Sequence, residues 1–328
     1  MTIRVGIVGY GNLGRGVEAS ICQNPDMKLI AVFTRRNPDS LKTNDKSVKV
    51  LHVDKAREYV NDIDVLILCG GSATDLPVQG PYFSMFFNTV DSYDTHAKIL
   101  EYSAAVNKSA LANGKTAAIS IGWDPGLFSM NRVLAEAVLP QGKEYTFWGR
   151  GVSQGHSDAV RRVNGVKNAV QYTVPVEKSL QKVRNGETPQ LTTGEKHIRE
   201  CFVVPEAEAD KEKISHEIKS MPHYFNEYET SVTFITEEEF AKNHTGMPHG
   251  GFVIRSGQTG QDPVNNHIVE FSINLDSNPE FTASILVAYA RAVYRLNCEG
   301  QIGAKTVFDI PLAYLSARTS EELLRELL

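Results

Sequence analysis

The first third of the chain alternates short, continuously apolar runs with longer stretches of mixed polarity. Continuous apolar runs are typical of strands buried on both faces, and the stretches between them have the length of helices. The pattern predicts strands at 3–8, 28–33, 48–53, 64–69, 88–90 and 116–121, with helices that include 15–21, 95–112 and 127–139. This order predicts an α/β domain with a parallel sheet that binds ligands at the carboxyl ends of its strands.

Beyond residue 139 the pattern changes. A stretch rich in glycine and polar residues, 145–158, precedes longer strands in which apolar and polar positions alternate. Such alternation indicates strands with one solvated face, and hence an α+β domain with a mixed or antiparallel sheet. The strands are expected at 169–174, 197–204, 228–235, 251–256 and 267–275, the helices at 176–186 and 210–220, and an exposed loop at 258–266.

The end of the chain is expected to return to the first domain, through a helix at 281–296 and the segment 304–328. The predicted division is therefore 1–122, completed by roughly 278–328, and 123–277.

A glycine-rich turn follows the first strand. Gly9-Tyr10-Gly11-Asn12-Leu13-Gly14 lies between a strand and a helix, where it lets a pyrophosphate approach the positive end of the helix. Glycine-rich turns also occur for structural reasons, but this context predicts a dinucleotide-binding, Rossmann-type doubly wound sheet.

The second strand ends in Thr34-Arg35-Arg36, where an NAD-binding unit would carry a carboxylate for the ribose hydroxyl. Two guanidinium groups can hold a 2′-phosphate by charge-assisted hydrogen bonds, so the pair predicts NADP(H). The alternative interpretation of Arg35 and Arg36 is a solvated loop.

The later strand ends complete the expected cofactor site. A turn of small residues follows the strand at 64–69, and polar turns follow the strands at 88–90 and 116–121. The expected cofactor contacts are Gly9, Gly11, Asn12, Leu13, Gly14, Thr34, Arg35, Arg36, Cys69, Gly70, Gly71, Ser72, Ser92, Tyr93, Asp94, Ile121, Gly122, Trp123, Asp124 and Pro125.

Two carboxylates, Asp94 and Asp124, come just after strand ends on this edge. Each precedes a predicted helix and could be a helix cap, and Pro125 suits a first helical turn. Because two aspartates share one edge, each beside an aromatic residue, a substrate site is the preferred interpretation.

Composition narrows the function classes. The net charge is −5 and no basic stripe is present, which argues against a nucleic-acid surface. The four cysteines, Cys22, Cys69, Cys201 and Cys298, show no C-x-x-C spacing, as expected of reduced thiols in a cytoplasmic protein without a zinc site. No apolar run reaches about 18 residues, and the first strand begins too early for a signal peptide, so no membrane association is expected.

The spacing around His156, His244 and His249 predicts neither a hydrolase triad nor a metal site. His156-Ser157-Asp158 cannot form a hydrolase triad, because adjacent residues cannot reach relay geometry, and Ser157 is expected to cap a helix at 158–162. His244 and His249 lack the i, i+4 spacing of a metal pair, and a surface loop is the alternative interpretation for each.

Five segments together resemble the meso-diaminopimelate dehydrogenase family along essentially the whole chain. They are the glycine turn with Arg15, Thr34-Arg35-Arg36, Gly122-Trp123-Asp124-Pro125-Gly126, Ser153-Gln154-Gly155-His156-Ser157-Asp158 and His244-Thr245-Gly246-Met247-Pro248-His249-Gly250-Gly251. The resemblance implies NADP-dependent oxidative deamination of meso-2,6-diaminopimelate at its D-centre, giving L-2-amino-6-oxopimelate, ammonia and NADPH. It also implies a homodimer in which the second domain binds substrate and dimerises, and a reverse reaction that feeds lysine and peptidoglycan precursors.

The resemblance also implies residue roles. Asp94 and Asp124 would orient the reacting amino group and serve as acid or base. Arg199 would make a forked contact with the distal carboxylate, although a surface ion pair is its alternative. Thr173, His249 and Asn274 would join Arg199, with a strand-end turn as the alternative for Asn274. Trp148, Ser153 and Gln154 would line the reacting half.

Two other functions share the first motif. One is another reductase of this fold, such as dihydrodipicolinate reductase or homoserine dehydrogenase, which would lack the two later aspartate-containing motifs. The other is a non-catalytic NADP(H) sensor, for which paired aspartates and a distal arginine would have no task.

Overall fold

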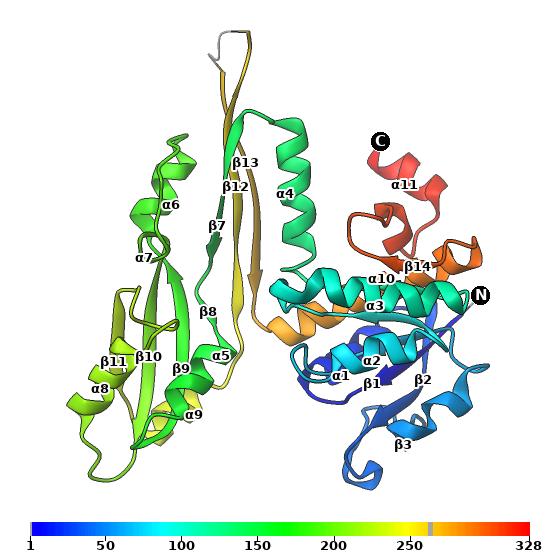
Figure 1. Cartoon of the computed structure of the whole chain (residues 1–328), viewed down its shortest axis with the longest axis horizontal. Coiled ribbons are helices and arrows are strands. Elements are labelled where there is room, and N and C mark those ends of the chain that lie inside the picture. Colours follow the sequence, from blue (N-terminus) through cyan, green and yellow to red (C-terminus); the bar gives the residue numbers. More distant parts are fainter. Residues whose placement is uncertain (1, 262–264) are drawn as a thin grey trace. The chain divides into compact units, whose positions relative to one another are not determined.

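The computed structural model describes residues 2–261 and 265–328, which form two compact units (Figure 1). The first unit comprises the chain up to Met130 and Pro279–Leu328, and the second is Asn131–Asn278. The sequence places the first division earlier, at 122/123. The structure keeps the turn after residue 122 in the first unit, where Trp123 packs edge-on against Phe128 with ring centroids 5.4 Å apart.

The first unit contains a seven-stranded parallel sheet in the order β14-β6-β5-β4-β1-β2-β3. The order reverses between β1 and β4, the point at which doubly wound sheets bind dinucleotides. The strands are β1 (Ile3–Val8), β2 (Met27–Thr34), β3 (Lys49–His52), β4 (Val65–Leu68), β5 (Asn88–Asp91), β6 (Thr116–Ala118) and β14 (Gly303–Lys305). The predicted Rossmann-type sheet is therefore confirmed, and its central strands β1 and β4 are almost fully buried, as continuous apolar runs predict.

Helices separate these strands along the chain. They are α1 (Asn12–Cys22), α2 (Leu76–Phe83), α3 (Ile99–Ala112), α10 (Asn278–Cys298) and α11 (Ser320–Leu327), with 3-10 helices η1 (Pro38–Ser40), η2 (Val53–Tyr59), η3 (His96–Lys98) and η4 (Leu312–Leu315). Helix α4 (Leu127–Val138) runs from the first unit into the second. No helix among the described residues combines the length and apolar character needed to span a membrane.

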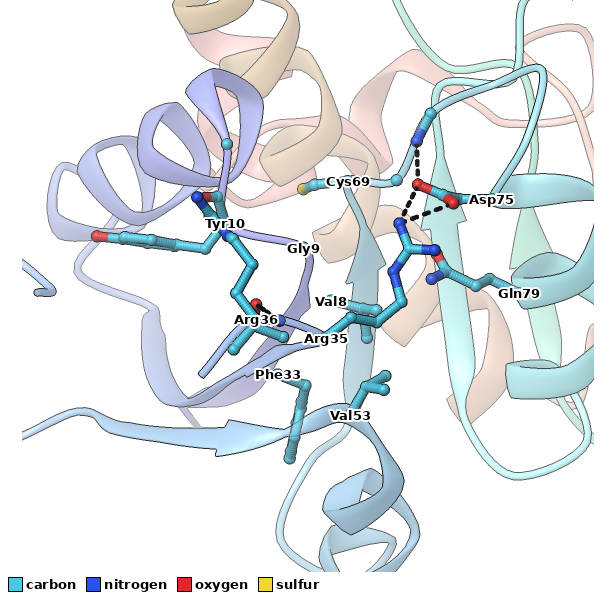
Figure 2. A pocket seen from close by; sticks show the side chains of 14 residues that line it. Val8, Gly9, Tyr10, Phe33, Arg35, Arg36, Val53, Cys69, Asp75 and Gln79 are labelled. Carbon is cyan, nitrogen blue, oxygen red and sulfur yellow. Dashed lines mark hydrogen bonds and ion pairs between the residues drawn. The ribbon is translucent and has the colours of Figure 1, made fainter. Parts of the chain in front are cut away.

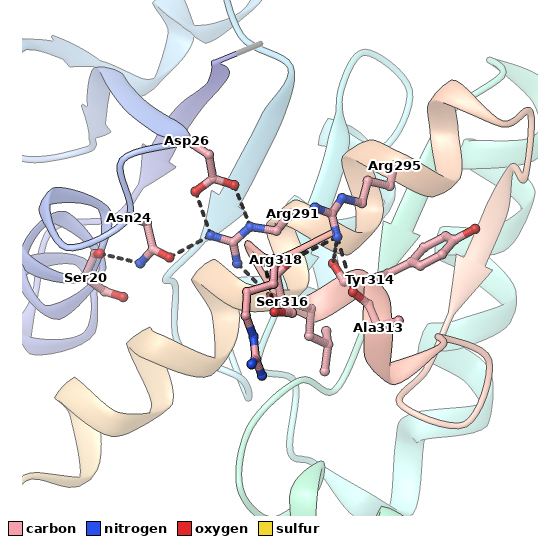
Figure 3. A network of polar contacts seen from close by, with 10 residues as sticks. Ser20, Asn24, Asp26, Arg291, Arg295, Ala313, Tyr314, Ser316 and Arg318 are labelled. Atoms are coloured by element: carbon pink, nitrogen blue, oxygen red, sulfur yellow. Dashed lines mark hydrogen bonds and ion pairs between the residues drawn. The ribbon is translucent and has the colours of Figure 1, made fainter. Parts of the chain in front are cut away.

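Two arginines of α10 fasten the C-terminal segment to this unit (Figure 3). Arg291 is 2% exposed, forms an ion pair with Asp26 at 2.6 Å and donates to the Leu315 carbonyl at 2.7 Å. Arg295 donates to the carbonyls of Tyr314 and Ser316 at 3.1 and 2.9 Å. The C-terminal residues Pro279–Leu328 thus belong to the first unit.

The second unit contains two sheets, one mixed and one antiparallel, as the alternating pattern predicts. The first has the order β11-β10-β9-β8, with β10 and β11 parallel, and the second has the order β13-β12-β7. Their strands are β7 (Gly142–Trp148), β8 (Gly151–Val152), β9 (Val166–Pro175), β10 (His197–Pro205), β11 (Thr230–Phe234), β12 (His249–Thr259) and β13 (Asn265–Leu275). The helices are α5 (Gln154–Arg161), α6 (Glu177–Arg184), α7 (Thr193–Lys196), α8 (Lys211–Ser220) and α9 (Glu237–Asn243).

Two local predictions in this unit are wrong. The expected loop at 258–266 is shorter, because β12 continues to Thr259 and β13 begins at Asn265; residues 262–264 lie outside the described part. Ser157 does not cap a helix but lies inside α5, where its hydroxyl donates to the Ser153 carbonyl at 2.7 Å. The helix starts four residues earlier than its polar sequence suggests.

Candidate functional site

The glycine turn after β1 has the shape that a bound pyrophosphate requires. Gly9 has φ +91°, a conformation that residues with a side chain rarely adopt. A Cβ at Gly14 would lie 2.2 Å from the Gly9 carbonyl oxygen, so only glycine lets α1 start this close to the turn. A Cβ at Gly11 would meet no atom within 4 Å, so this side of the turn is open.

The turn borders a cavity of about 210 Å³ at the switch point of the sheet (Figure 2). Segments that follow β1, β2 and β4 meet there, as the topology requires. Its lining includes many of the predicted cofactor residues, namely Gly9, Gly11, Thr34, Arg35, Arg36, Cys69, Gly70 and Gly71, together with Val8, Tyr10, Phe33, Val53, Asp75 and Gln79. Asn12, Leu13 and Gly14 follow in the first turns of α1.

Both arginines of the predicted phosphate site line this cavity. Arg35 forms an ion pair with Asp75 at 2.9 Å, and its side chain is 66% exposed. Arg36 donates to the carbonyl of Tyr10 in the glycine turn. A guanidinium has five N–H donors, so these contacts orient the two groups without using all their donors. Both arginines are exposed, as a solvated loop would also be, but each makes a contact with another residue that lines the cavity.

Sequence reasoning missed Asp75 and Gln79. Asp75 accepts the backbone N–H of Gly71 at 2.9 Å and so fixes the small-residue turn after β4. The buried side-chain oxygen of Gln79 has no hydrogen-bond partner among the described residues. Neither residue belongs to a spacing motif, and both reach the cavity only because α2 begins at this strand end.

These features fit a dinucleotide that carries a 2′-phosphate. One cavity is lined by the glycine turn, by Gln79 and by the guanidinium groups of Arg35 and Arg36. The turn has no room for a Cβ at Gly14, and the buried oxygen of Gln79 has no partner among the described residues. The glycine turn and α1 would hold the pyrophosphate, and Arg35 with Arg36 would hold the 2′-phosphate.

The two aspartates at the later strand ends lie on loops of the same unit. Asp94 is exposed, and its backbone N–H donates to the Ser72 hydroxyl at 2.8 Å. Asp124 is half-buried in the turn between Trp123 and Gly126. The N-cap of η3 is Thr95 rather than Asp94, and α4 begins three residues after Asp124.

In the second unit, Arg199 lies on β10 directly opposite Thr173 on β9. Arg199 is 6% exposed, donates to the Thr173 hydroxyl and lies over the Tyr228 ring, 4.0 Å from its centroid. Its Nε has no hydrogen-bond partner, and no carboxylate within the described ranges forms an ion pair with it. Burial lowers the pKa of Arg199. The surface ion pair considered for Arg199 is therefore wrong, and the buried cation lacks a counter-charge.

His249 and Trp148 lie near this arginine along the sheet edges. His249 packs against Gly151, where a Cβ would come within 2.8 Å of its ring, and Gly151 pairs with Thr173. The rings of Trp148 and His249 are 6.5 Å apart and perpendicular. Burial lowers the pKa of His249. The surface-loop interpretation of His249 is wrong, because this histidine begins β12.

Two further histidines of this unit, the buried His197 and the half-buried His156, have lowered pKa values. His197 accepts the backbone N–H of Trp148 at 2.7 Å, and burial lowers the pKa of His197 to about 3. His156 shares a hydrogen bond of 2.7 Å with the Ser153 hydroxyl, and burial lowers the pKa of His156 to about 4. The sequence did not predict these two hydrogen bonds. The His197 bond joins segments that are distant in the chain, and the His156 bond spans one helical turn.

Gln154 and His244 belong to two other motifs of the second unit. Gln154 donates from its amide to the sulfur of Met247 at 3.3 Å. His244 is the C-cap residue of α9 and half-buried; its ring stacks on Phe202 with centroids 4.4 Å apart and forms a 2.9 Å hydrogen bond with the Tyr172 hydroxyl.

Asn274 lies near the end of β13 and is exposed. In the β12–β13 register Asn274 is opposite Gly250, and His249 is opposite the next residue, Leu275. Gly250 and Gly251 have φ of +144° and +158°, so the backbone of β12 is irregular beside His249.

Among the described residues, no group of three or more His, Cys, Asp or Glu side chains is arranged to hold a metal ion. The four cysteines are unpaired, and burial raises the pKa of Cys201 to about 12.

Comparison with known proteins gives one consistent family. Residues 122–277 match a family model described as the diaminopimelic acid dehydrogenase C-terminal domain. Meso-diaminopimelate D-dehydrogenase of Ureibacillus thermosphaericus is 65% identical over 326 residues, which are 99% of this chain and 99% of that protein.

Two solved structures cover the whole chain as well. The C. glutamicum DAP dehydrogenase in complex with DAP is 49% identical, with a TM-score of 0.89 and 100% coverage of both chains. An engineered D-amino acid dehydrogenase bound to NADP+ is 47% identical, with a TM-score of 0.85 and the same coverage.

Proposed function

The chain belongs to the meso-diaminopimelate D-dehydrogenase family, and from this membership we infer that it catalyses the reversible, NADP-dependent oxidative deamination of meso-2,6-diaminopimelate. The D-centre is oxidised, and water replaces its nitrogen. The products are L-2-amino-6-oxopimelate, ammonia and NADPH. The aminating direction supplies a precursor of lysine and peptidoglycan.

The observation that carries this assignment is the buried, uncompensated guanidinium of Arg199. A buried charge is costly unless it is paired. A ligand with a carboxylate supplies that pair, and the planar guanidinium binds it through two parallel hydrogen bonds. Diaminopimelate has a carboxylate at each end, so one end can be bound here while the other reacts.

We assign the L-centre of the substrate to Arg199, Thr173 and His249. Thr173 already accepts a hydrogen bond from Arg199, which orients the guanidinium. The lowered pKa of His249 keeps its ring neutral. A neutral ring can donate to or accept from the substrate without adding a second positive charge beside Arg199.

We assign the D-centre to Asp94 and Asp124, with Trp148, Ser153 and Gln154 lining this half of the substrate. The amine must lose its proton before hydride leaves the carbon, and a carboxylate within hydrogen-bond reach can accept that proton. The same carboxylates can hold the water that hydrolyses the imine. Asp94 is exposed and Asp124 half-buried, each on a loop that follows a strand of the parallel sheet.

The nicotinamide accepts the hydride when the cofactor is bound. The chain's contribution is to hold that cofactor by the glycine turn and the two arginines, and to fix the distal end of the substrate. With the L-centre held, only one configuration at the other carbon directs its hydrogen toward the acceptor. We propose this as the basis of selectivity for the D-centre of the meso isomer.

The test is NADP+ reduction by the purified chain with the meso, LL and DD isomers of diaminopimelate. NADPH formation with the meso isomer, and none with the LL isomer, supports the assignment. Binding of NADPH without turnover of the meso isomer would favour an NADP(H) sensor instead.

We further infer a cytoplasmic homodimer. The four unpaired cysteines suit a reducing compartment. Apolar side chains on α4 support self-association, since Val133, Leu134 and Val138 are 50, 60 and 62% exposed. Light scattering at micromolar concentration tests the dimer, and a mass of 36.2 kDa would contradict it.

A further inference from the structure

A buried carboxylate with no assigned task lies at the end of β5. Asp91 is 1% exposed and is the last residue of that strand. It precedes Asp94 by three residues and pairs with Leu68 of β4 in the sheet. A charged group this deeply buried persists only when several donors hold it.

One oxygen of Asp91 bridges two loops. Its Oδ1 accepts the backbone N–H of Tyr93 at 3.0 Å and that of Ser120 at 3.2 Å. The first bond turns the chain that leads to Asp94, and the second holds the chain that leads to Asp124. The same two loops are also joined by the Ile121 N–H, which donates to the Asp91 carbonyl at 2.8 Å.

The other oxygen ties Asp91 to a helix. Its Oδ2 accepts the Tyr102 hydroxyl of α3 at 2.6 Å. The Tyr102 ring stacks on Tyr93, with centroids 4.0 Å apart and planes 17° apart. Gly80 leaves room for that hydroxyl, because a Cβ there would lie 2.1 Å from it. The carboxylate thus fixes both loops to a rigid element.

The loop after β6 needs such a restraint. Its strand ends at Ala118, and Ser120 adopts φ +56°, which is uncommon for a residue with a side chain. Strained backbone of this kind persists when surrounding contacts determine it. Burial raises the pKa of Asp91 to about 6, against the opposite effect of its three hydrogen bonds.

We propose that Asp91 is a positioning residue that fixes the loops of Asp94 and Asp124 relative to each other for the reaction at the D-centre. The proposal rests on the proposed function of those two aspartates. Misplacement of a reacting group by about 1 Å costs on the order of 100-fold in rate. Asp91 itself contacts neither substrate nor cofactor in this account.

A second buried carboxylate offers a matched control. Glu18, 1% exposed, accepts the backbone N–H groups of Asn44 and Asp45 at 2.8 and 3.1 Å and the hydroxyl of Tyr10. Glu18 and Asp91 each accept three hydrogen bonds, but the residues that donate to Glu18 lie on segments that carry neither Asp94 nor Asp124. Removal of the Glu18 carboxylate therefore tests the effect of destabilisation without displacement of the two aspartates.

The experiment compares Asp91→Ala, Asp91→Asn and Glu18→Ala in the full chain. It measures kcat/KM for meso-diaminopimelate at saturating NADP+, with the melting temperature of each variant. Asp91→Ala is expected to lose about 30-fold or more, because two loops lose their shared acceptor. Asp91→Asn keeps an acceptor oxygen and is expected to stay within about fivefold of wild type.

The outcomes separate the proposal from its premise. Asp91→Ala within about threefold of wild type, or Glu18→Ala with an equal loss, would overturn the positioning role. If Asp91→Ala does not fold, Asp91→Thr replaces it, because its shorter hydroxyl cannot span both amides. Lack of wild-type turnover would instead refute the proposed function.

Discussion

Arg199 donates to the hydroxyl of Thr173 across two paired strands, and its buried guanidinium has no carboxylate partner among residues 2–261 and 265–328. Proteins rarely keep a buried cation in this condition without a function for it. The pair is built from two β-strands, so its geometry is set before any ligand arrives. In the proposed function, Arg199 would bind the distal carboxylate of a substrate that has one carboxylate at each end.

Replacement of Arg199 by methionine should cripple turnover. We expect Arg199→Met to lower kcat/KM for meso-diaminopimelate by about 100-fold or more, equivalent to ~3 kcal/mol, because the substrate carboxylate loses its partner. The dissociation constant for NADPH should stay unchanged. Arg318→Met is the control, since Arg318 forms an exposed pair with Glu326. Unchanged kinetics would remove Arg199 from the site.

The same substitution should stabilise the ligand-free protein. Methionine is apolar and of similar length, so Arg199→Met removes the cost of an uncompensated buried charge, by about 1–3 kcal/mol. Urea unfolding without substrate measures the change. A lower free energy of unfolding would show that Arg199 serves the fold rather than a ligand.

Removal of both phosphate-site arginines should change cofactor preference. Arg35→Ser with Arg36→Ser is expected to raise the dissociation constant for NADPH by about 100-fold, because the 2′-phosphate loses two charge-assisted contacts. NADH lacks that phosphate, so its affinity should change by less than about threefold. Fluorescence titration of both cofactors provides the comparison, and equal losses would contradict the assignment.

The neutral histidines predict a pH dependence of stability. In the folded chain, burial lowers the pKa of His197 to about 3, whereas an unfolded histidine titrates near 6.5. The unfolded state therefore binds the extra proton, and the histidine's contribution is present above pH 6.5 and lost as the pH falls. Below pH 6 the wild type should lose about 1.4 kcal/mol more per pH unit than His197→Gln. Parallel curves for the two proteins between pH 7 and 5 would contradict a neutral His197.

The sequence predicted the first unit well because its signals are local. Continuous apolar runs located the central strands, and the glycine turn and Arg35-Arg36 located the cavity that the structure places at the switch point. The short strand β6 ends earlier than predicted, because Ser120 leaves the extended conformation. No apolar pattern records that departure.

What the sequence could not predict depends on contacts between distant segments. Asp91 and Asp75 act through hydrogen bonds to loops and side chains that no spacing motif encodes. The position of Asn274 opposite Gly250 is set by the β12–β13 register, which the apolar pattern of its strand does not encode. A shift of one residue exchanges the two faces of a strand, and composition cannot detect it.

The most direct test of the account follows the hydrogen that leaves the substrate. Meso-diaminopimelate labelled with deuterium only at its D-centre is incubated with the chain and NADP+, and the NADPH is analysed by mass spectrometry. We predict that NADPH gains one deuterium from this substrate and none from substrate labelled only at the L-centre. Deuterium arriving from the L-centre, or no NADPH at all, would contradict oxidation at the D-centre.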